Sequence, residues 1–316
     1  MRPLDSKRAK PLPDPTLLEA LDNDLLIRCA SYLDADGLAR LGRTSATFGT
    51  PQAGQQRSLA NEAAHQRFRQ SATDEERRCL PKHGDESDIG LYRALEQLRE
   101  PLSFDELVGR GFSRQQHPAR VTYTGRGGRS TAVSGHVMRG GRHFVEFAIN
   151  NVGQYAPSVF LGVIRPVSLT SDIDLEADWK WHVYPMYVSS RSNPAVSGKL
   201  RSQRTSKWGD SDIHCCSYYC YDGRCRRTDW DTKETDCEWH GREGLDESGT
   251  IGLLLDLDEG TLSVFENNRR LGVMKEGGLS GEYCWFVSVW ITSCVISISK
   301  RRAPNLLEGW RFPIFY

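Results

Sequence analysis

Residues 250–265 carry two apolar runs joined by a tight turn, and this pattern restricts the folds open to the chain. In the first run, residues 250–257, Leu253, Leu255 and Leu257 lie on one face of the predicted strand. Leu254 and Asp256 lie on the other face, so both faces are largely apolar. Asp258-Glu259-Gly260 supplies the turn, because glycine takes a positive φ without strain, and residues 261–265 form the returning strand. A strand with two apolar faces is typical of the interior of a β-sandwich. We expect the Asp256 carboxylate to accept hydrogen bonds from the backbone of the turn.

Other short runs after residue 120 are rich in β-branched and aromatic residues and are separated by turn residues. They predict further strands at residues 121–123, 143–149, 158–164, 216–219, 271–273, 286–289 and 295–298. Many short antiparallel strands over about 180 residues predict an antiparallel β-sandwich. All eight tryptophans of the chain lie in this second half.

The first hundred residues have a different composition, rich in leucine, alanine, glutamate, arginine and glutamine, which favour helices. Apolar residues recur every fourth position in residues 21–33 and predict a helix there. A second short helix follows through Leu38 and Leu41, residues 45–56 are expected to be a loop, and residues 57–69 and 89–99 are expected to be helical. Thr73 with Glu76, and Ser103 with Glu106, have the spacing of helix capping boxes.

These patterns predict an α+β multidomain protein, with a small N-terminal helical domain followed by the sandwich. The boundaries we expect are a disordered tail at 1–16, a helical domain at 17–110, a sandwich at 111–300 and a C-terminal tail at 301–316.

Charge and hydropathy exclude several classes of function. The 41 basic and 41 acidic residues balance, which gives no global attraction to nucleic acid. No apolar run approaches 18 residues, and residues 1–15 lack the apolar segment of a signal peptide, so we expect no membrane association and a cytoplasmic or nuclear location. In such a reducing compartment the nine cysteines are expected to be thiols or ligands rather than disulfides.

Five cysteines and two histidines fall between His214 and His240, and their spacing permits a zinc site. The intervening Ser217-Tyr218-Tyr219 instead favours a strand, with Cys216 and Cys220 on one face and Cys215 on the other, where thiols pack as small apolar groups. We expect packing, no metal and no cofactor, with a zinc site as the alternative. No nucleophile signature accompanies any cysteine, so we do not expect an enzyme. The basic residues between 191 and 207 suggest a solvated loop or, alternatively, a site for acidic peptides.

Residues 21–45 resemble an F-box: a short helix ends at Tyr32-Leu33-Asp34, and a helix with a Leu-x-x-Leu pattern runs into Thr44-Ser45. The family usually opens with Leu-Pro, and here Asp22 stands at the position of the proline. The resemblance implies that these helices bind a Skp-family adaptor of a cullin ligase. The residues expected to contact the adaptor are Leu21, Asp22, Leu25, Leu26, Leu33, Leu38 and Leu41.

Residues 249–273 resemble the signature hairpin of the SPRY domain, residues 143–149 and 160–163 its opening strands, and residues 283–290 its closing aromatic strand. The resemblance implies a bent β-sandwich that binds proteins through loops at one edge and has no catalytic residues of its own. Val289 and Trp290 match a Val-Trp pair that helps to form the peptide pocket of SPRY domains like those of SOCS-box proteins. Ile291 stands where those proteins carry glycine. The alternative is that Trp290 packs in the core.

The two resemblances together predict the substrate-recognition subunit of a Skp-cullin-F-box ubiquitin ligase, which binds the adaptor at one end and a protein or peptide target at the other. The alternative is a SPRY interaction module that works outside any ligase. A zinc-dependent or thiol enzyme is a third class.

Overall fold

The computed structural model describes residues 21–82, 86–153, 156–232, 234–291 and 293–301, which divide between two compact units. The helical unit contains the described residues up to 72 and residues 86–96, and the larger unit contains residues 73–82 and 97–301. The division therefore does not fall at residue 110, since residues 73–82 and 97–110 group with the sandwich. Of the two predicted tails, only Arg301 lies within the described residues.

The helical unit contains the helices expected from the sequence and one further single-turn helix. They are α1 (Asn23–Ala30), α2 (Ala35–Thr44), α3 (Ala46–Gly49), α4 (Leu59–Ser71) and the first part of α6 (Asp88–Arg99). The side chains of Asp22, Asp34 and Ser58 cap α1, α2 and α4 by accepting hydrogen bonds from backbone N–H groups of the first turn. The expected loop at 45–56 is interrupted by the single-turn α3, because Phe48 is buried there. Among the helices of the described ranges, none has the length and hydropathy needed to cross a membrane.

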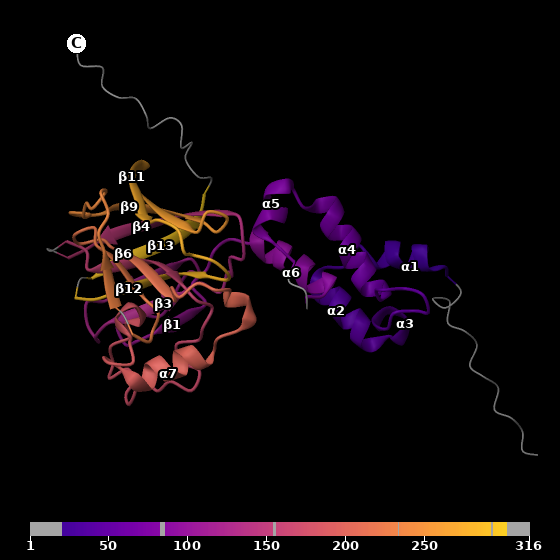
Figure 1. Cartoon of the computed structure of the whole chain (residues 1–316), viewed down its shortest axis with the longest axis horizontal. Coiled ribbons are helices and arrows are strands. Elements are labelled where there is room, and N and C mark those ends of the chain that lie inside the picture. Colours follow the sequence, from indigo (N-terminus) through magenta and orange to yellow (C-terminus); the bar gives the residue numbers. More distant parts are fainter. Residues whose placement is uncertain (1–20, 83–85, 154–155, 233, 292, 302–316) are drawn as a thin grey trace, which may run out of the picture. The chain divides into compact units, whose positions relative to one another are not determined.

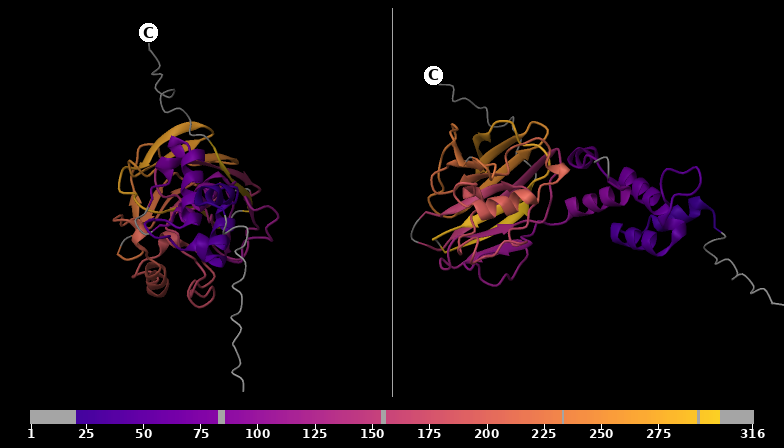
Figure 2. Two further views of the ribbon diagram at one scale, coloured as in Figure 1. Left: turned by 90° about the vertical axis from the view of Figure 1, so that its right-hand side faces the viewer. Right: turned by 60° about the horizontal axis from the view of Figure 1, so that its bottom comes forward.

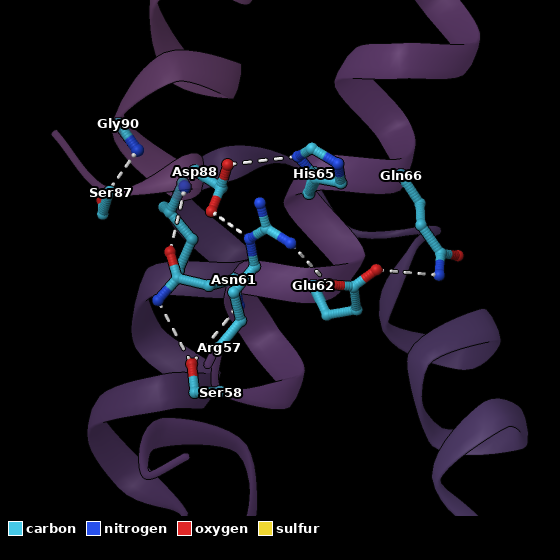
Figure 3. Close-up of polar contacts among 10 residues, drawn as sticks. Arg57, Ser58, Asn61, Glu62, His65, Gln66, Ser87, Asp88 and Gly90 are labelled. Atoms are coloured by element: carbon cyan, nitrogen blue, oxygen red, sulfur yellow. Dashed lines mark hydrogen bonds and ion pairs between the residues drawn. The ribbon is translucent and has the colours of Figure 1, made fainter. Parts of the chain in front are cut away.

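A buried carboxylate joins α4 to the start of α6 (Figure 3). Asp88 lies at the first position of α6 and accepts hydrogen bonds from Arg57 Nε at 2.9 Å and from His65 Nδ1 at 3.2 Å. The backbone N–H of Ile89 donates to Asn61 Oδ1 at 3.2 Å. Bonds to charged partners stabilise more than neutral ones, so this network fixes the register of the two helices.

The two capping boxes expected from the sequence have different outcomes. Thr73 and Glu76 form one, at the start of α5 (Asp74–Cys79), which confirms that prediction. The prediction for Ser103 and Glu106 is wrong. Ser103 Oγ donates to Asp105, and Glu106 opens strand β1 (Glu106–Val108), where its carboxylate accepts from the distant backbone N–H of Leu169 at 2.9 Å.

The larger unit is an antiparallel β-sandwich (Figure 1). One sheet has seven strands in the order β1-β3-β12-β5-β6-β7-β8, and the other has six in the order β11-β10-β9-β4-β13-β2. The strands after β1 are β2 (Arg120–Tyr123), β3 (Ser130–Val133), β4 (Arg142–Asn151), β5 (Val159–Ile164), β6 (Cys215–Tyr219), β7 (Cys225–Thr228), β8 (Glu234–Cys237), β9 (Gly249–Asp256), β10 (Thr261–Glu266), β11 (Arg269–Lys275), β12 (Cys284–Val289) and β13 (Cys294–Lys300).

The hairpin of β9 and β10 has the two buried faces that the sequence predicts. Leu253 and Leu255 lie in the core between the sheets, whereas Leu254 packs with Phe144 and Phe265 on the other side of the six-stranded sheet. Asp256 Oδ1 accepts from the backbone N–H groups of Asp258 and Glu259, each at 3.1 Å, which confirms its expected role in the turn.

The outer face of the seven-stranded sheet is covered by the long segment between β5 and β6. This segment includes the 3-10 turns η1 (Pro185–Tyr187) and η2 (Ser206–Trp208) and helix α7 (Pro194–Ser202), which lies outside the sheets (Figure 1 and Figure 2). The expectation of a solvated loop at 191–207 is wrong for α7. Asn193 caps this helix, and Val196 and Leu200 are buried with the core residues of the outer face.

Arg165 fixes the point where this covering segment leaves β5. Its side chain is fully buried, and its guanidinium donates to the backbone carbonyls of Ser280 at 2.8 Å, Glu282 at 3.1 Å and Ser211 at 3.2 Å. The guanidinium also lies 4.1 Å from the centroid of the Tyr283 ring. Burial lowers the pKa of Arg165 to about 10, which leaves the group charged at neutral pH. One cation therefore satisfies carbonyls of two loops that no strand ladder reaches.

We expect Arg165→Met to lower the free energy of unfolding by roughly 3 to 5 kcal/mol, because three buried carbonyls lose their donor. Arg165→Lys should also destabilise the protein, since a single ammonium cannot reach carbonyls on both loops. Urea unfolding measures both. Arg301→Met is the control, because its side chain is 62% exposed, and it should change stability by less than about 0.5 kcal/mol. Equal stability of Arg165→Met and the parent would contradict the role of Arg165.

Candidate functional site

Trp290 directly follows β12 and is held there by its backbone N–H, which donates to the carbonyl of Ser158 at 3.0 Å. Side chains alternate along the strand, so Trp290 shares the outer face of the seven-stranded sheet with Phe286 and Ser288. Its indole is half-buried, which places it at the edge of the packed region rather than in the core. Val289, the other predicted target contact, points to the opposite face and is fully buried between the sheets, so it supports the strand and cannot contact a ligand.

Arg129, which precedes β3, lies against the indole. Its guanidinium carbon is 4.2 Å from the centroid of Trp290 and 4.4 Å from that of Tyr184, so both rings contact the same cation. The Nε atom of Arg129 is buried and has no hydrogen-bond partner among the described residues. The Trp290 and Tyr184 rings therefore form cation–π contacts with the Arg129 guanidinium.

The aromatic residues continue from Trp290 across the neighbouring strands. Phe160 is the register partner of both Ser288 and Tyr219, so its ring faces the same side and stacks on Tyr219 with centroids 4.1 Å apart. Tyr184 and Tyr187 also stack, at 4.5 Å, and Arg226 lies 4.0 Å from the Tyr187 ring. We call this group the aromatic–arginine surface. Its members are Arg129, Phe160, Tyr184, Tyr187, Tyr219, Tyr221, Arg226 and Trp290.

Charge and exposure determine what the aromatic–arginine surface can bind. Burial raises the pKa of Tyr184 and of Tyr187, so both phenols are neutral at physiological pH. Tyr221 is 56% exposed, and Trp290, Tyr187 and Tyr219 are half-buried. The surface thus offers apolar ring faces beside two guanidinium groups, a combination suited to a peptide with apolar and acidic or carbonyl groups.

Ile291 stands where the resemblance noted in the sequence leads us to expect glycine, and its backbone has the conformation that glycine favours. Its φ is +69°, in the left-handed region that favours glycine, and its side chain is 53% exposed. The backbone therefore keeps the glycine-type conformation, but a branched apolar side chain projects beside Trp290. A β-branched residue in this region is strained, which is a feature that concentrates at binding sites.

The predicted adaptor contacts divide into an exposed and a buried set. Leu21, Leu25 and Leu33 are 39%, 46% and 38% exposed, and Asp22 is exposed as the N-cap of α1. By contrast, Leu26 and Leu38 are buried in the helical unit and cannot contact a partner, and Leu41 is half-buried.

Two exposed residues that the adaptor prediction did not include extend the exposed set. Tyr32 is 82% exposed and Cys29 is exposed. Together with the exposed leucines they follow the helical spacing, and we call Leu21, Leu25, Cys29, Tyr32 and Leu33 the α1 stripe. The pattern of every fourth residue already contained this signal, but it could not separate the outward leucines from the inward ones.

The cysteines between 215 and 237 lie on the faces that alternation predicts. Cys216 and Cys220 belong to the core between the sheets, and Cys215 lies on the outer face. His214 lies between Trp208 and Trp230, with ring centroids 5.1 Å from each. Within the ranges that the structure describes, no three histidine, cysteine or acidic side chains are placed to hold a metal ion.

A cavity of about 350 Å³ opens in the larger unit beside the six-stranded sheet. Cys79, His136, His143, Phe144, Trp285 and Lys300 are among the residues that line it. Burial lowers the pKa of His136 to about 3 and that of His143 to about 4. His143 Nε2 lies 2.8 Å from the carbonyl of Gly140, which fixes the orientation of the neutral ring.

Comparison with known proteins gives structural likeness only. No protein-family model matches the sequence, and no curated protein matches it. Similar solved structures include the SPRY domain of human HERC1, with 13% identity and a TM-score of 0.42 over 64% of this chain and 99% of that one. The TRIM65 PSpry domain is similar at 12% identity and a TM-score of 0.38, over 64% and 93% of the two chains. The carbohydrate-binding module CBM66 from Bacillus subtilis has 8% identity and a TM-score of 0.34, over 64% and 97%. The strand order and register of the two sheets define the sandwich independently of these likenesses.

The buried histidines predict a pH dependence of stability. His143 has a folded pKa of about 4 against an ordinary value of 6.5, so the unfolded chain binds the proton more tightly. Its contribution to stability is complete above pH 6.5 and is lost as the pH falls toward 4. Lowering the pH from 7 to 5 should therefore cost about 2 kcal/mol through this residue.

The His143→Gln variant isolates this effect, because glutamine can still donate to the Gly140 carbonyl but does not titrate. Its unfolding free energy should fall less than that of the parent between pH 7 and 5, in urea titrations at each pH. The same pH slope in both proteins would contradict the assignment.

Proposed function

We propose that this protein is a substrate receptor that binds a protein or peptide target through the aromatic–arginine surface and a Skp-family adaptor through the α1 stripe. It would act in the cytoplasm or nucleus as part of a cullin-based ubiquitin ligase. The chain itself would supply binding and no chemical step.

The observation that carries the proposal is the position of Trp290. Its backbone is fixed at the end of β12, its indole is partly exposed, and its neighbours are an arginine and further aromatic rings. Tryptophan, tyrosine and arginine are enriched among the residues that dominate protein-binding energy, because they offer large contact area with few rotamers to immobilise. The resemblance of residues 249–273 and 283–290 to the SPRY domain supports the same use of this edge.

The α1 stripe supports the second half of the proposal. Leu25 on α1, and Leu21, Tyr32 and Leu33 in the segments that flank this helix, leave apolar area in water, and a partner groove would bury that area. Asp22 has a φ of −68°, which is the value that proline imposes, so the backbone at this position has the conformation that the Leu-Pro opening of the F-box family requires. The resemblance of residues 21–45 to the F-box supports an adaptor as the partner.

Trp290→Ala should weaken the binding of peptides selected from a phage-displayed library on the full chain by at least tenfold, with a loss of unfolding free energy smaller than that for a buried tryptophan. Isothermal calorimetry and urea unfolding on the same preparation measure both quantities.

The control for this test is Trp239→Ala. Trp239 is a half-buried tryptophan that packs on the core between the sheets, so its loss should reduce stability without changing peptide affinity. If Trp290→Ala binds the selected peptides as tightly as the parent, the aromatic–arginine surface is not the target site.

Leu25→Asp and Leu33→Asp should each abolish co-purification with a recombinant Skp-family adaptor, because a carboxylate in the centre of an apolar interface costs several kcal/mol. Both side chains are exposed, so the variants should unfold at the same temperature as the parent.

Val152→Asp is the matched control, since Val152 is also an exposed apolar residue, at 70%, but belongs to the sandwich. Retained adaptor binding in both leucine variants would remove the α1 stripe from the interface. A parent protein that binds the selected peptides but no adaptor would instead be an interaction module outside a ligase.

A further inference from the structure

Three thiols lie on adjacent strands at the inner face of the seven-stranded sheet. Cys225 of β7 is the direct register partner of Cys237 of β8, and the Sγ atoms of Cys216 and Cys225 are 4.0 Å apart. None of these contacts is needed for the target or adaptor surfaces.

The register brings Cys225 and Cys237 within reach of a covalent bond. Direct partners in an antiparallel pair have side chains on the same face and Cα atoms about 4.5 to 5.5 Å apart. Disulfides span Cα separations of about 4.4 to 6.8 Å. The register therefore places Cys225 and Cys237 at a backbone separation that a disulfide can span.

The surroundings make these two thiols unequal. Cys237 is half-buried, whereas Cys225 and Cys216 are fully buried. Hydrogen bonding with the Cys225 thiol lowers the pKa of Cys237 to about 7, assisted by the positive charges of Arg227 and Lys275 and opposed by burial and by the negative charge of Asp236. The hydrogen bonds with Cys216 and Cys237, together with burial, raise the pKa of Cys225. At neutral pH a substantial fraction of Cys237 is therefore thiolate, whereas Cys225 remains a thiol.

Other buried cysteines lack this combination. Burial raises the pKa of Cys215, Cys220, Cys284 and Cys294, which keeps each of them as an unreactive thiol. Cys29 is exposed on α1, and no other cysteine lies near it in the sequence. Reactivity toward an oxidant and an adjacent resolving thiol coincide at Cys237 and Cys225.

We propose that Cys237 and Cys225 form a reversible redox site, in which hydrogen peroxide oxidises Cys237 and Cys225 closes a disulfide. The Cys237 thiolate attacks one peroxide oxygen, the O–O bond breaks, and with one proton the products are Cys237 sulfenic acid and water. The Cys225 sulfur then attacks the Cys237 sulfur, its proton leaves with the sulfenic oxygen as a second water, and the S–S bond forms. The two thiols lose two electrons and hydrogen peroxide gains them.

The bridge would join β8 to β7 at one edge of the seven-stranded sheet. In the strand order β8 is terminal, so the hydrogen bonds to β7 hold it on one side. A disulfide between β7 and β8 would hold the edge strand covalently, where otherwise only hydrogen bonds hold it, until a thiol reductant cleaves the bond.

The test uses the full chain with Cys29→Ser, reduced and then treated with micromolar hydrogen peroxide under native conditions. Remaining thiols are blocked with N-ethylmaleimide, and a chymotryptic digest is analysed by mass spectrometry. Cleavage after Tyr221, Trp230 and Trp239 separates Cys225 from Cys237 into two peptides. We expect these two peptides to be linked, two thiols to be lost, and dithiothreitol to restore both.

Three serine variants assign the roles. Cys237→Ser should slow thiol loss at least tenfold, Cys225→Ser should stop at a sulfenic acid on Cys237 that dimedone traps, and Cys216→Ser should still form the link. A bridge between Cys216 and Cys225 that persists in Cys237→Ser would overturn the proposal. So would intact thiols in the folded parent after peroxide, a result that does not depend on whether any variant folds.

Discussion

The seven-stranded sheet is apolar on both faces, and the rest of the larger unit follows from the need to cover them. The six-stranded sheet buries the inner face, and the segment between β5 and β6 buries the outer one. That segment carries little regular structure, so its backbone carbonyls need donors other than a strand ladder. Arg165, at the start of the segment, donates to the carbonyl of Ser211 within it, and the same guanidinium also donates to the carbonyls of Ser280 and Glu282 in the loop before β12. Exchange of this buried cation for an apolar side chain would leave those carbonyls without this donor, at a cost of about 1 to 3 kcal/mol for each unsatisfied group.

The aromatic–arginine surface lies where this covering layer ends. Tyr184 and Tyr187 are its last side chains over Phe160, and beyond them Trp290 and Tyr221 remain accessible. The rings that could contact a target are therefore packed against rings that belong to the fold. Such support limits the rotamers that binding must immobilise, and so lowers the entropic cost of association. The α1 stripe has a different basis, because there the outward side chains of a single short helix are exposed while its inward ones form the core of the helical unit.

The sequence was informative where structure depends on near neighbours. The hairpin of β9 and β10, the turn role of Asp256 and the capping box of Thr73 each involve residues within a few positions of one another. It failed where the partner lies far along the chain. Glu106 has the spacing of a helix cap, but its carboxylate accepts a hydrogen bond from the backbone N–H of Leu169. Helix α7 is held because Val196 and Leu200 are buried in a cluster with residues of strands that lie before and after it in the chain. The sequence predicts Trp290 as a target contact but does not predict Arg129. Arg129 lies 161 residues earlier in the chain, and only the pairing of β3 with β12 brings it next to Trp290.

The alternation of side chains along β7 places two kinds of chemistry one residue apart. Arg226 faces outward, where it contacts the Tyr187 ring and forms an ion pair with Asp236 at 2.9 Å. Cys225 faces inward against Cys237, and the two pairs are successive rungs of the same ladder. A change in the covalent state of the inner rung acts on the backbone that also positions the outer rung, because neighbouring residues share a peptide plane. Oxidation of Cys225 and Cys237 therefore takes place on the inner face of the sheet, away from the aromatic–arginine surface. Arg226, which belongs to that surface, lies on the same strand as Cys225.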